Sequence, residues 1–187
     1  LYLFNGKNGE IQKHDKVKLV PFGEFIPFKN FFNLNKLTQG NLDFSKGTSI
    51  NPLVVENKFN ILPLICYEII FSNLVAKDKQ YNFLVNITND GWYGKSFGPH
   101  QHLALSKIRA VEEGRVVLRV ANTGISAVIN YDGKILSSLK LDEKGIIDKK
   151  VILLKTNTLY KKIGDNLFYG LISVLCFYLL ITYRTFW

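Results

Sequence analysis

The chain has 187 residues, of which 47% are hydrophobic and 13% aromatic, so its composition excludes a disordered protein and its length excludes two full domains. Its formal net charge of +9 would suit a nucleic acid or an anionic membrane. The lysines are scattered and form no basic run interleaved with aromatic residues, so we expect no nucleic-acid partner. We also expect a monomer that carries no cofactor.

The N-terminal part of the chain is predicted to be largely extended. Two Asn-Gly turn signals, at residues 5–6 and 8–9, predict a hairpin within residues 1–13. Residues 16–22 (KVKLVPF) predict a strand that runs into a turn. The aromatic, Asn-rich residues 26–47 predict a short helix and a long loop. Such a loop is exposed unless it lies on a membrane or covers a site.

The middle of the chain shows the alternation of strands and helices that is typical of an α/β domain. Continuous apolar runs indicate strands buried on both faces, and apolar residues at helical spacing indicate helices. In chain order, the predicted elements are a strand at 59–66, a helix at 67–77, a strand at 81–88, a helix at 99–115, a strand at 116–121, a hairpin at 125–139 and a last strand at 149–154. The sequence therefore predicts a layered α/β domain whose sheet is covered at least in part by helices.

The C-terminal part contains a continuous apolar run. It extends from Leu167 to Tyr183 without a charge and reaches the roughly 17 residues that a helix needs at least to cross a bilayer. We predict a transmembrane helix over residues 163–184, with a buried core helix as the alternative. Basic residues lie on both sides of the run, so the positive-inside rule does not give its orientation.

Cys66 is the first candidate for chemistry. It follows a predicted buried strand and precedes a predicted helix, at the edge of the sheet where functional groups collect in α/β folds. The positive N-terminus of a helix favours a thiolate there. The alternative is a small buried hydrophobic residue, which is what most lone cysteines are. Cys176 lies within the apolar C-terminal run, so we expect no disulfide between the two cysteines.

Three charged residues supply the other groups that a cysteine nucleophile needs. Glu68 follows the thiol by two residues, and Lys16 and Glu24 lie on a predicted strand and turn upstream. A glutamate can accept the thiol proton, and a lysine can stabilise the negative charge that develops on the substrate. The residues alone leave open whether this set is catalytic.

Four strings of residues then occur in an order and spacing shared with a known family. They are DKVKLVPFGEFIPF, LICYEIIF, NITNDGWYGKSFGPHQHLALSKIRAVEEGR and ANTGISAVINYDGKI. From about Lys16 to Lys134, the sequence resembles the bacterial apolipoprotein N-acyltransferase family of the nitrilase superfamily. The resemblance implies an α/β fold built as an αββα sandwich, present in part as a catalytic domain over residues 1–158 and followed by the transmembrane helix.

The resemblance also implies roles for individual residues. Cys66 matches the nucleophile of the family, Lys16 matches its catalytic lysine, and Glu24 matches a second glutamate that supports the site. Tyr67 and Glu68 match the two residues after the nucleophile, which shape the pocket. The backbone N–H of Tyr67 would help Lys16 to bind the oxyanion. The catalytic set that the resemblance implies is a general-base glutamate, the lysine and the cysteine.

The general-base glutamate of the family has no counterpart in the sequence. In the family it lies well upstream of the lysine, whereas Glu10 is too close to Lys16 to fill that role. We therefore expect the chain to be the C-terminal part of a longer protein, with the base in the part that precedes Leu1. For the same reason we expect the isolated chain to be inactive.

The segment after the second buried strand offers further candidates. Trp92 and Tyr93 lie in the Gly-flanked loop 89–98, where they either pack within the loop or form a mobile lid that contacts lipid. We include Trp92 among the pocket residues. His100 and His102 could ligate a metal, but no third ligand at a useful spacing is present, so we interpret them as solvated or helix-capping residues and predict no metal site.

The resemblance implies a two-step acyl transfer. The Cys66 thiolate attacks an acyl ester of a membrane phospholipid, and the α-amine of a diacylglyceryl-cysteine lipoprotein then takes the acyl group from the thioester. The implied partners are a phospholipid donor, a diacylated lipoprotein acceptor and the membrane. The implied location is the bacterial inner membrane, with the catalytic domain on the periplasmic side. Two alternatives remain: a nitrilase-type amidase for small C–N substrates, and a non-catalytic binding module or inactive fragment.

Overall fold

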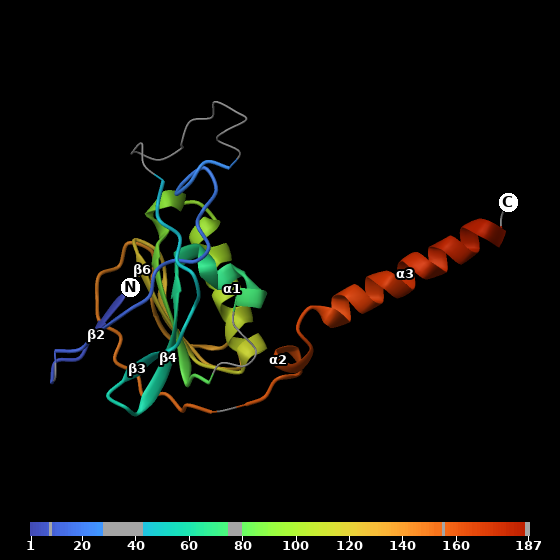
Figure 1. The fold of residues 1–187 in the computed structure, drawn as a ribbon. Coiled ribbons are helices and arrows are strands. Elements are labelled where there is room, and N and C mark those ends of the chain that lie inside the picture. The colour runs from blue at the N-terminus through green and yellow to red at the C-terminus, as the bar shows by residue number, and fades with distance from the viewer. Residues whose placement is uncertain (8, 28–42, 75–79, 155, 186–187) are drawn as a thin grey trace.

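The computed structural model describes residues 1–7, 9–27, 43–74, 80–154 and 156–185, and in this part of the chain a six-stranded mixed sheet forms the centre (Figure 1). In spatial order its strands are β3 (Leu53–Val55), β4 (Phe59–Ile65), β5 (Phe83–Asn89), β6 (Val117–Asn122), β7 (Ser126–Ile129) and β8 (Ile135–Leu139). β4, β5 and β6 run parallel, and the other pairs are antiparallel. The carboxyl ends of the three parallel strands therefore meet at one edge of the sheet.

The core lies between the sheet and helix α1 (Gly98–Glu113), which packs against β6 and β7. β4 buries the consecutive residues 61–64, as a strand covered on both faces does. Leu103 and Ala110 are the buried apolar residues on the inner side of α1. Gly114 ends α1 with a φ of +60°, and a Cβ at this position would lie 2.0 Å from the Thr156 hydroxyl, so the turn requires glycine.

Two predicted hairpins are confirmed. Residues 1–13 contain β1 (Tyr2–Phe4) paired with β2 (Ile11–Lys13), and residues 125–139 contain β7 and β8. The strand predicted at 16–22 is wrong. The N–H groups of Val17 and Lys18 donate to the carboxylate of Glu68 instead of to a neighbouring strand, so a tertiary contact replaces the sheet pairing.

Two further predictions need correction. The segment after β4 forms the short 3₁₀ helices η1 (Cys66–Ile70) and η2 (Ser72–Leu74) rather than a longer helix, and residues 75–79 lie outside the described residues. Residues 149–154 form no strand: no strand of the described sheets pairs with them, and Ile152 is 72% exposed. Of the helix and loop predicted at 26–47, residues 28–42 also lie outside the described part.

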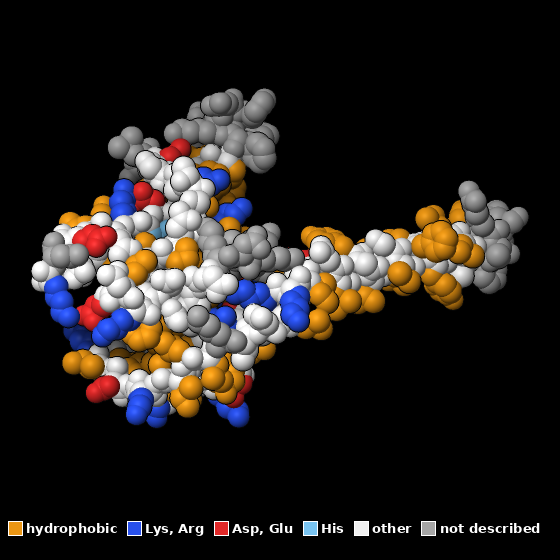
Figure 2. Space-filling view, turned by 60° about the horizontal axis from the view of Figure 1, so that its bottom comes forward, with side chains coloured by type: hydrophobic (Ala, Val, Ile, Leu, Met, Phe, Trp, Pro, Cys, Tyr) orange, Lys and Arg blue, Asp and Glu red, His pale blue; other side chains and the backbone are white. Residues whose placement is uncertain are grey.

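Two helices follow the sheet domain. α2 (Leu159–Ile163) ends at Gly164, and α3 (Asn166–Thr185) extends away from the domain (Figure 1). Within the described residues, one stretch, Asn166–Tyr183, is long and apolar enough to cross a membrane, and none of it is buried against the rest of the chain. Apolar side chains project along the whole length of this helix (Figure 2). The alternative of a buried core helix therefore does not hold in this structure.

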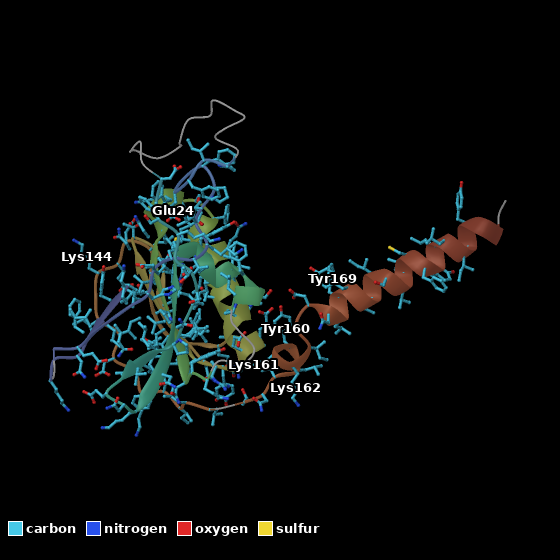
Figure 3. All side chains as sticks on the ribbon, in the orientation of Figure 1. Glu24, Lys144, Tyr160, Lys161, Lys162 and Tyr169 are labelled. Atoms are coloured by element: carbon cyan, nitrogen blue, oxygen red, sulfur yellow. The ribbon has the colours of Figure 1, made fainter. Side chains whose placement is uncertain are left out.

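A cluster of buried groups attaches α2 to the C-terminal end of α1; we call it the attachment cluster. Tyr81 donates a hydrogen bond from its hydroxyl to the carboxylate of Glu113. Lys161 Nζ lies 3.7 Å from that carboxylate and 4.4 Å from the centre of the Tyr81 ring. Arg115 donates to the backbone carbonyl of Thr156 at 2.7 Å. Figure 3 labels Lys161 at the junction of α1 and α2.

Candidate active site

Cys66 lies directly after the carboxyl end of β4 and begins η1. Its φ is +52°, in the left-handed region that residues other than glycine seldom adopt. This backbone conformation costs about 1–3 kcal/mol. The strand-to-helix turn places it at a cavity of about 320 Å³, lined by Val20, Pro21, Gly23, Glu24, Cys66, Trp92 and Tyr93. A strained, partly exposed thiol at the edge of a parallel sheet is the arrangement that a nucleophile needs.

Lys16 and Glu24 form an ion pair, and Glu24 lines this cavity. The ammonium of Lys16 donates to both carboxylate oxygens of Glu24, at 2.7 and 2.8 Å, and Lys16 is only 9% exposed. Glu24 also accepts a hydrogen bond from the Val20 N–H at 2.8 Å, which fixes the carboxylate to its own turn. Because Glu24 and Cys66 line one cavity, the structure brings the three residues predicted as catalytic to one region, at the end of the domain opposite α2 (Figure 3).

Glu68 is completely buried and holds two segments together. Its carboxylate accepts hydrogen bonds from the N–H groups of Val17, Lys18 and Ile65 at 2.5, 3.2 and 2.7 Å, and lies 3.3 Å from Nε2 of His14. Burial alone raises the pKa of this carboxyl, but the hydrogen bonds from His14 and the backbone outweigh burial and lower the pKa below its usual value. Glu68 thus fixes the Lys16 segment against the end of β4.

The remaining predicted pocket residues lie on the two 3₁₀ helices beside Cys66. Trp92, in η3 (Asp90–Tyr93), lines the cavity and is 63% exposed, and Tyr93 lines it as well. Partial burial raises the pKa of the Tyr93 hydroxyl, and negative charge at Cys66 and Asp90 raises it further. Tyr67 stacks edge-on against Phe71, with ring centres 4.9 Å apart. Trp92 and Tyr93 therefore give the cavity an aromatic wall, whereas Tyr67 is not among the residues that line it.

A buried polar network lies beneath Cys66, and we call it the site network. Its members are Asn86, Asp90, His102 and Arg119, and each is at most 3% exposed. Arg119 donates to Asp90 and to Asn86, each at 2.6 Å, and His102 lies 2.9 Å from Asp90. Burial raises the pKa of the Asp90 carboxyl, but the hydrogen bond from His102 and the charge of Arg119 lower it below its usual value.

The site network was not predicted from the sequence. His102 is buried and bonded on both ring nitrogens, so its interpretation as a solvated or capping residue is wrong; His100 is exposed. A signal existed, because Asn86 and Thr88 occupy alternate positions of an apolar strand and Arg119 interrupts the next one. Within the described residues, no group of three or more His, Cys, Asp and Glu side chains is arranged to hold a metal ion.

Residues 1–157 match the carbon–nitrogen hydrolase family. The chain belongs to that family. It is 40% identical over 188 aligned residues to the apolipoprotein N-acyltransferase of Rickettsia prowazekii (strain Madrid E), covering 98% of this chain and 37% of that protein. It is 41% identical over 155 residues to the apolipoprotein N-acyltransferase of Rhizobium leguminosarum bv. trifolii (strain WSM2304), covering 81% of this chain and 29% of that protein.

Solved structures of the family confirm the fold. An amidase from Nesterenkonia sp. matches with a TM-score of 0.52 at 20% identity, over 75% of this chain and 50% of that chain. The CN-hydrolase superfamily protein XC1258 from Xanthomonas campestris matches with a TM-score of 0.50 at 18% identity, over 73% of this chain and 51% of that chain. The predicted nitrilase-like α/β fold is therefore confirmed as a partial sheet followed by one long apolar helix. The chain spans just over a third of the length of its Rickettsia relative.

Proposed function

We propose that this chain is the nucleophile-bearing, C-terminal part of a longer enzyme that transfers a fatty acyl group from a phospholipid to the N-terminal amine of a diacylglyceryl-cysteine lipoprotein. The observation that carries the proposal is the position of Cys66, which lines one cavity with Glu24, the partner of Lys16. The homology to apolipoprotein N-acyltransferases supports the choice of reaction.

In the first step, the Cys66 sulfur attacks the ester carbonyl carbon of the phospholipid, and the thiol proton passes to a general base. The carbonyl oxygen gains negative charge, which the Lys16 ammonium and the Tyr67 N–H stabilise. Collapse of this intermediate breaks the C–O bond, and the lysophospholipid leaves with a proton. Glu24 is engaged by Lys16 and by Val20, so it orients the lysine, and we place the general base on a glutamate elsewhere in the longer protein.

In the second step, the amine of the lipoprotein attacks the thioester carbon. The C–S bond breaks, an amide forms, and the Cys66 sulfur regains its proton. Two half-reactions that share one covalent intermediate predict ping-pong kinetics. The apolar walls of the cavity, to which Trp92 and Tyr93 contribute, suit an acyl chain better than a small polar amide.

α3 supports a lipid substrate. An unburied apolar helix that follows the domain is stable in a bilayer, and it would keep the domain at the membrane that contains the acyl donor. From the homology to apolipoprotein N-acyltransferases, we propose that the protein lies in a bacterial inner membrane, with the catalytic domain on the periplasmic side. A soluble-type amidase would share the Cys, Lys and Glu residues, but an enzyme that acts on small C–N substrates would not need this helix. A binding module would need neither the strained thiol nor the paired lysine.

The experiment uses the full-length gene product in vesicles that contain phospholipid with a labelled acyl chain, and a diacylglyceryl-cysteine peptide as acceptor. Cys66→Ser should lower acyl transfer by at least about 10³-fold, because the nucleophile is lost. Cys176→Ser is the matched control and should leave transfer unchanged, since this cysteine lies on the exposed surface of α3. Undiminished transfer by Cys66→Ser would contradict the proposal. Hydrolysis of small amides without any acyl transfer would favour the amidase.

A further inference from the structure

The backbone carbonyl of Cys66 is held by two buried side chains. Nδ2 of Asn86 donates to this oxygen at 3.3 Å, and Nε2 of His102 lies 3.2 Å from it. A carbonyl with two side-chain partners, contributed by a strand and a helix, is fixed from two directions. The strained φ of Cys66 needs such support, because a residue stays in the left-handed region only where its surroundings hold it there.

The two side chains are themselves fixed. Asn86 donates to the Leu64 carbonyl at 3.1 Å and accepts from Arg119 at 2.6 Å. His102 lies with Nδ1 2.9 Å from Asp90, whose other carboxylate oxygen accepts from Arg119 at 2.6 Å. Each ring nitrogen of His102 faces an oxygen acceptor, so both donate when the ring is protonated. The result is a closed set of hydrogen bonds that cannot shift at one member without leaving a buried polar atom unpaired.

The geometry of the peptide bond connects this network to the reaction. In a trans peptide, the carbonyl of Cys66 and the N–H of Tyr67 lie in one rigid plane and point in opposite directions. Fixing the carbonyl toward the protein interior therefore aims the N–H away from it. We propose that Asn86 and His102 are positioning residues that orient the Tyr67 N–H toward the oxyanion. The inference rests on the proposed function, because it needs an acyl intermediate on Cys66.

Two reactions of Cys66 separate positioning from a general structural role. Acyl transfer passes through an oxyanion, whereas alkylation by iodoacetamide displaces iodide from a saturated carbon and develops no oxyanion. A misdirected N–H therefore slows the first reaction and spares the second. Both rates are measured in the full-length gene product with Cys176→Ser in the background, so that Cys66 is the cysteine of this chain that reacts.

His102→Phe and Asn86→Leu each replace a donor by an apolar side chain of similar shape, and each should lower acyl transfer by about 10²-fold, as the loss of an oxyanion donor does. Alkylation should stay within about threefold of the parent. His102→Gln keeps one N–H for the carbonyl and should recover transfer to within about tenfold of the parent. His100→Phe changes an exposed histidine on the same helix and should leave both rates unchanged.

The outcomes distinguish the two proposals. Unchanged transfer in His102→Phe and Asn86→Leu, with transfer still dependent on Cys66, overturns the positioning role and leaves the proposed function intact. Equal losses of transfer and alkylation in both variants, with a lowered melting temperature, also overturn it, because the network would then only stabilise the fold. Transfer that does not depend on Cys66 contradicts the proposed function itself.

Discussion

The site network and the attachment cluster lie at opposite ends of β5 and α1, and both are buried polar assemblies. The site network follows β5 with Asp90 and meets the start of α1 at His102, whereas the attachment cluster precedes β5 with Tyr81 and meets the end of α1 at Glu113. Both contain an acid and a base, and burial raises the pKa of both acids, but the net shift is downward for Asp90 and upward for Glu113.

The difference lies in how the acids are compensated. Asp90 has a full guanidinium partner at 2.6 Å, and its pKa is lowered. The partners of Glu113 are the Tyr81 hydroxyl and the ammonium of Lys161, which lies 3.7 Å away. Burial raises the pKa of Glu113 and lowers the pKa of Lys161. The first assembly therefore keeps a fixed charge pair beneath Cys66, whereas the second tolerates loss of charge where α2 is attached to α1.

The largest effect is expected from breaking the fixed pair. Asp90→Asn leaves the completely buried guanidinium of Arg119 without its carboxylate, which destabilises a protein by about 3–5 kcal/mol. Lys161→Met, in the attachment cluster, should cost only about 1 kcal/mol, because Glu113 keeps its hydrogen bond from Tyr81 and can take up a proton. Thermal unfolding of the full-length gene product in detergent measures both. Equal shifts in melting temperature would erase the distinction between the two assemblies.

A smaller loss is expected at Glu68, which lies at the Cys66 end of the domain. Glu68→Gln keeps the shape but cannot accept from all of the backbone donors, so it should destabilise the fold by about 2–3 kcal/mol near neutral pH. Since folding lowers the pKa of Glu68, its contribution is fully present above 4.5 and is lost as the pH falls through the folded value. Melting temperatures from pH 2 to 6 should converge for the two proteins at the acid end; parallel curves would contradict this.

The smallest effect is expected at Glu113, and its sign is opposite. Folding raises the pKa of this carboxyl, so the folded state holds its proton more tightly, and stability falls as the pH rises from 4.5 through the folded value. Glu113→Gln imitates the protonated form, so it should flatten this decline while changing stability at pH 5 by less than about 1 kcal/mol. The measurement is the melting temperature from pH 5 to 9. A steeper decline in the variant would show that the sign is wrong.

The fold was predictable where local pattern and tertiary contact agree. β4 and β5 are continuous apolar runs, and the Asp-Gly turn near residue 132 fixes the β7–β8 hairpin, so these elements were found from sequence. Residues 16–22 have the pattern of a strand, but their N–H groups bind the carboxylate of Glu68, far away in the chain. A single distant acceptor leaves no periodic signal, so pattern alone could not reveal it.

The sequence predicted the candidate reactive groups of the site but not the buried site network beneath them. Cys66, Lys16 and Glu24 stand in recognisable strings, and the structure brings them to one region. Asn86 and Arg119 are directly paired in register across β5 and β6, so their contact depends on strand alignment, which the sequence does not state. The sequence could not show which of His100 and His102 is buried, because only the packing of α1 decides this.

The most direct test of the account is to identify the residue that carries the acyl group. The full-length gene product is incubated with labelled phospholipid in the absence of acceptor, digested, and analysed by mass spectrometry. We expect one acyl chain on the peptide that contains Cys66, released by neutral hydroxylamine as a thioester is, and transferred when the acceptor amine is added. An active enzyme that carries the acyl group on another residue, or transfers it without any acyl-enzyme, would contradict the central claim.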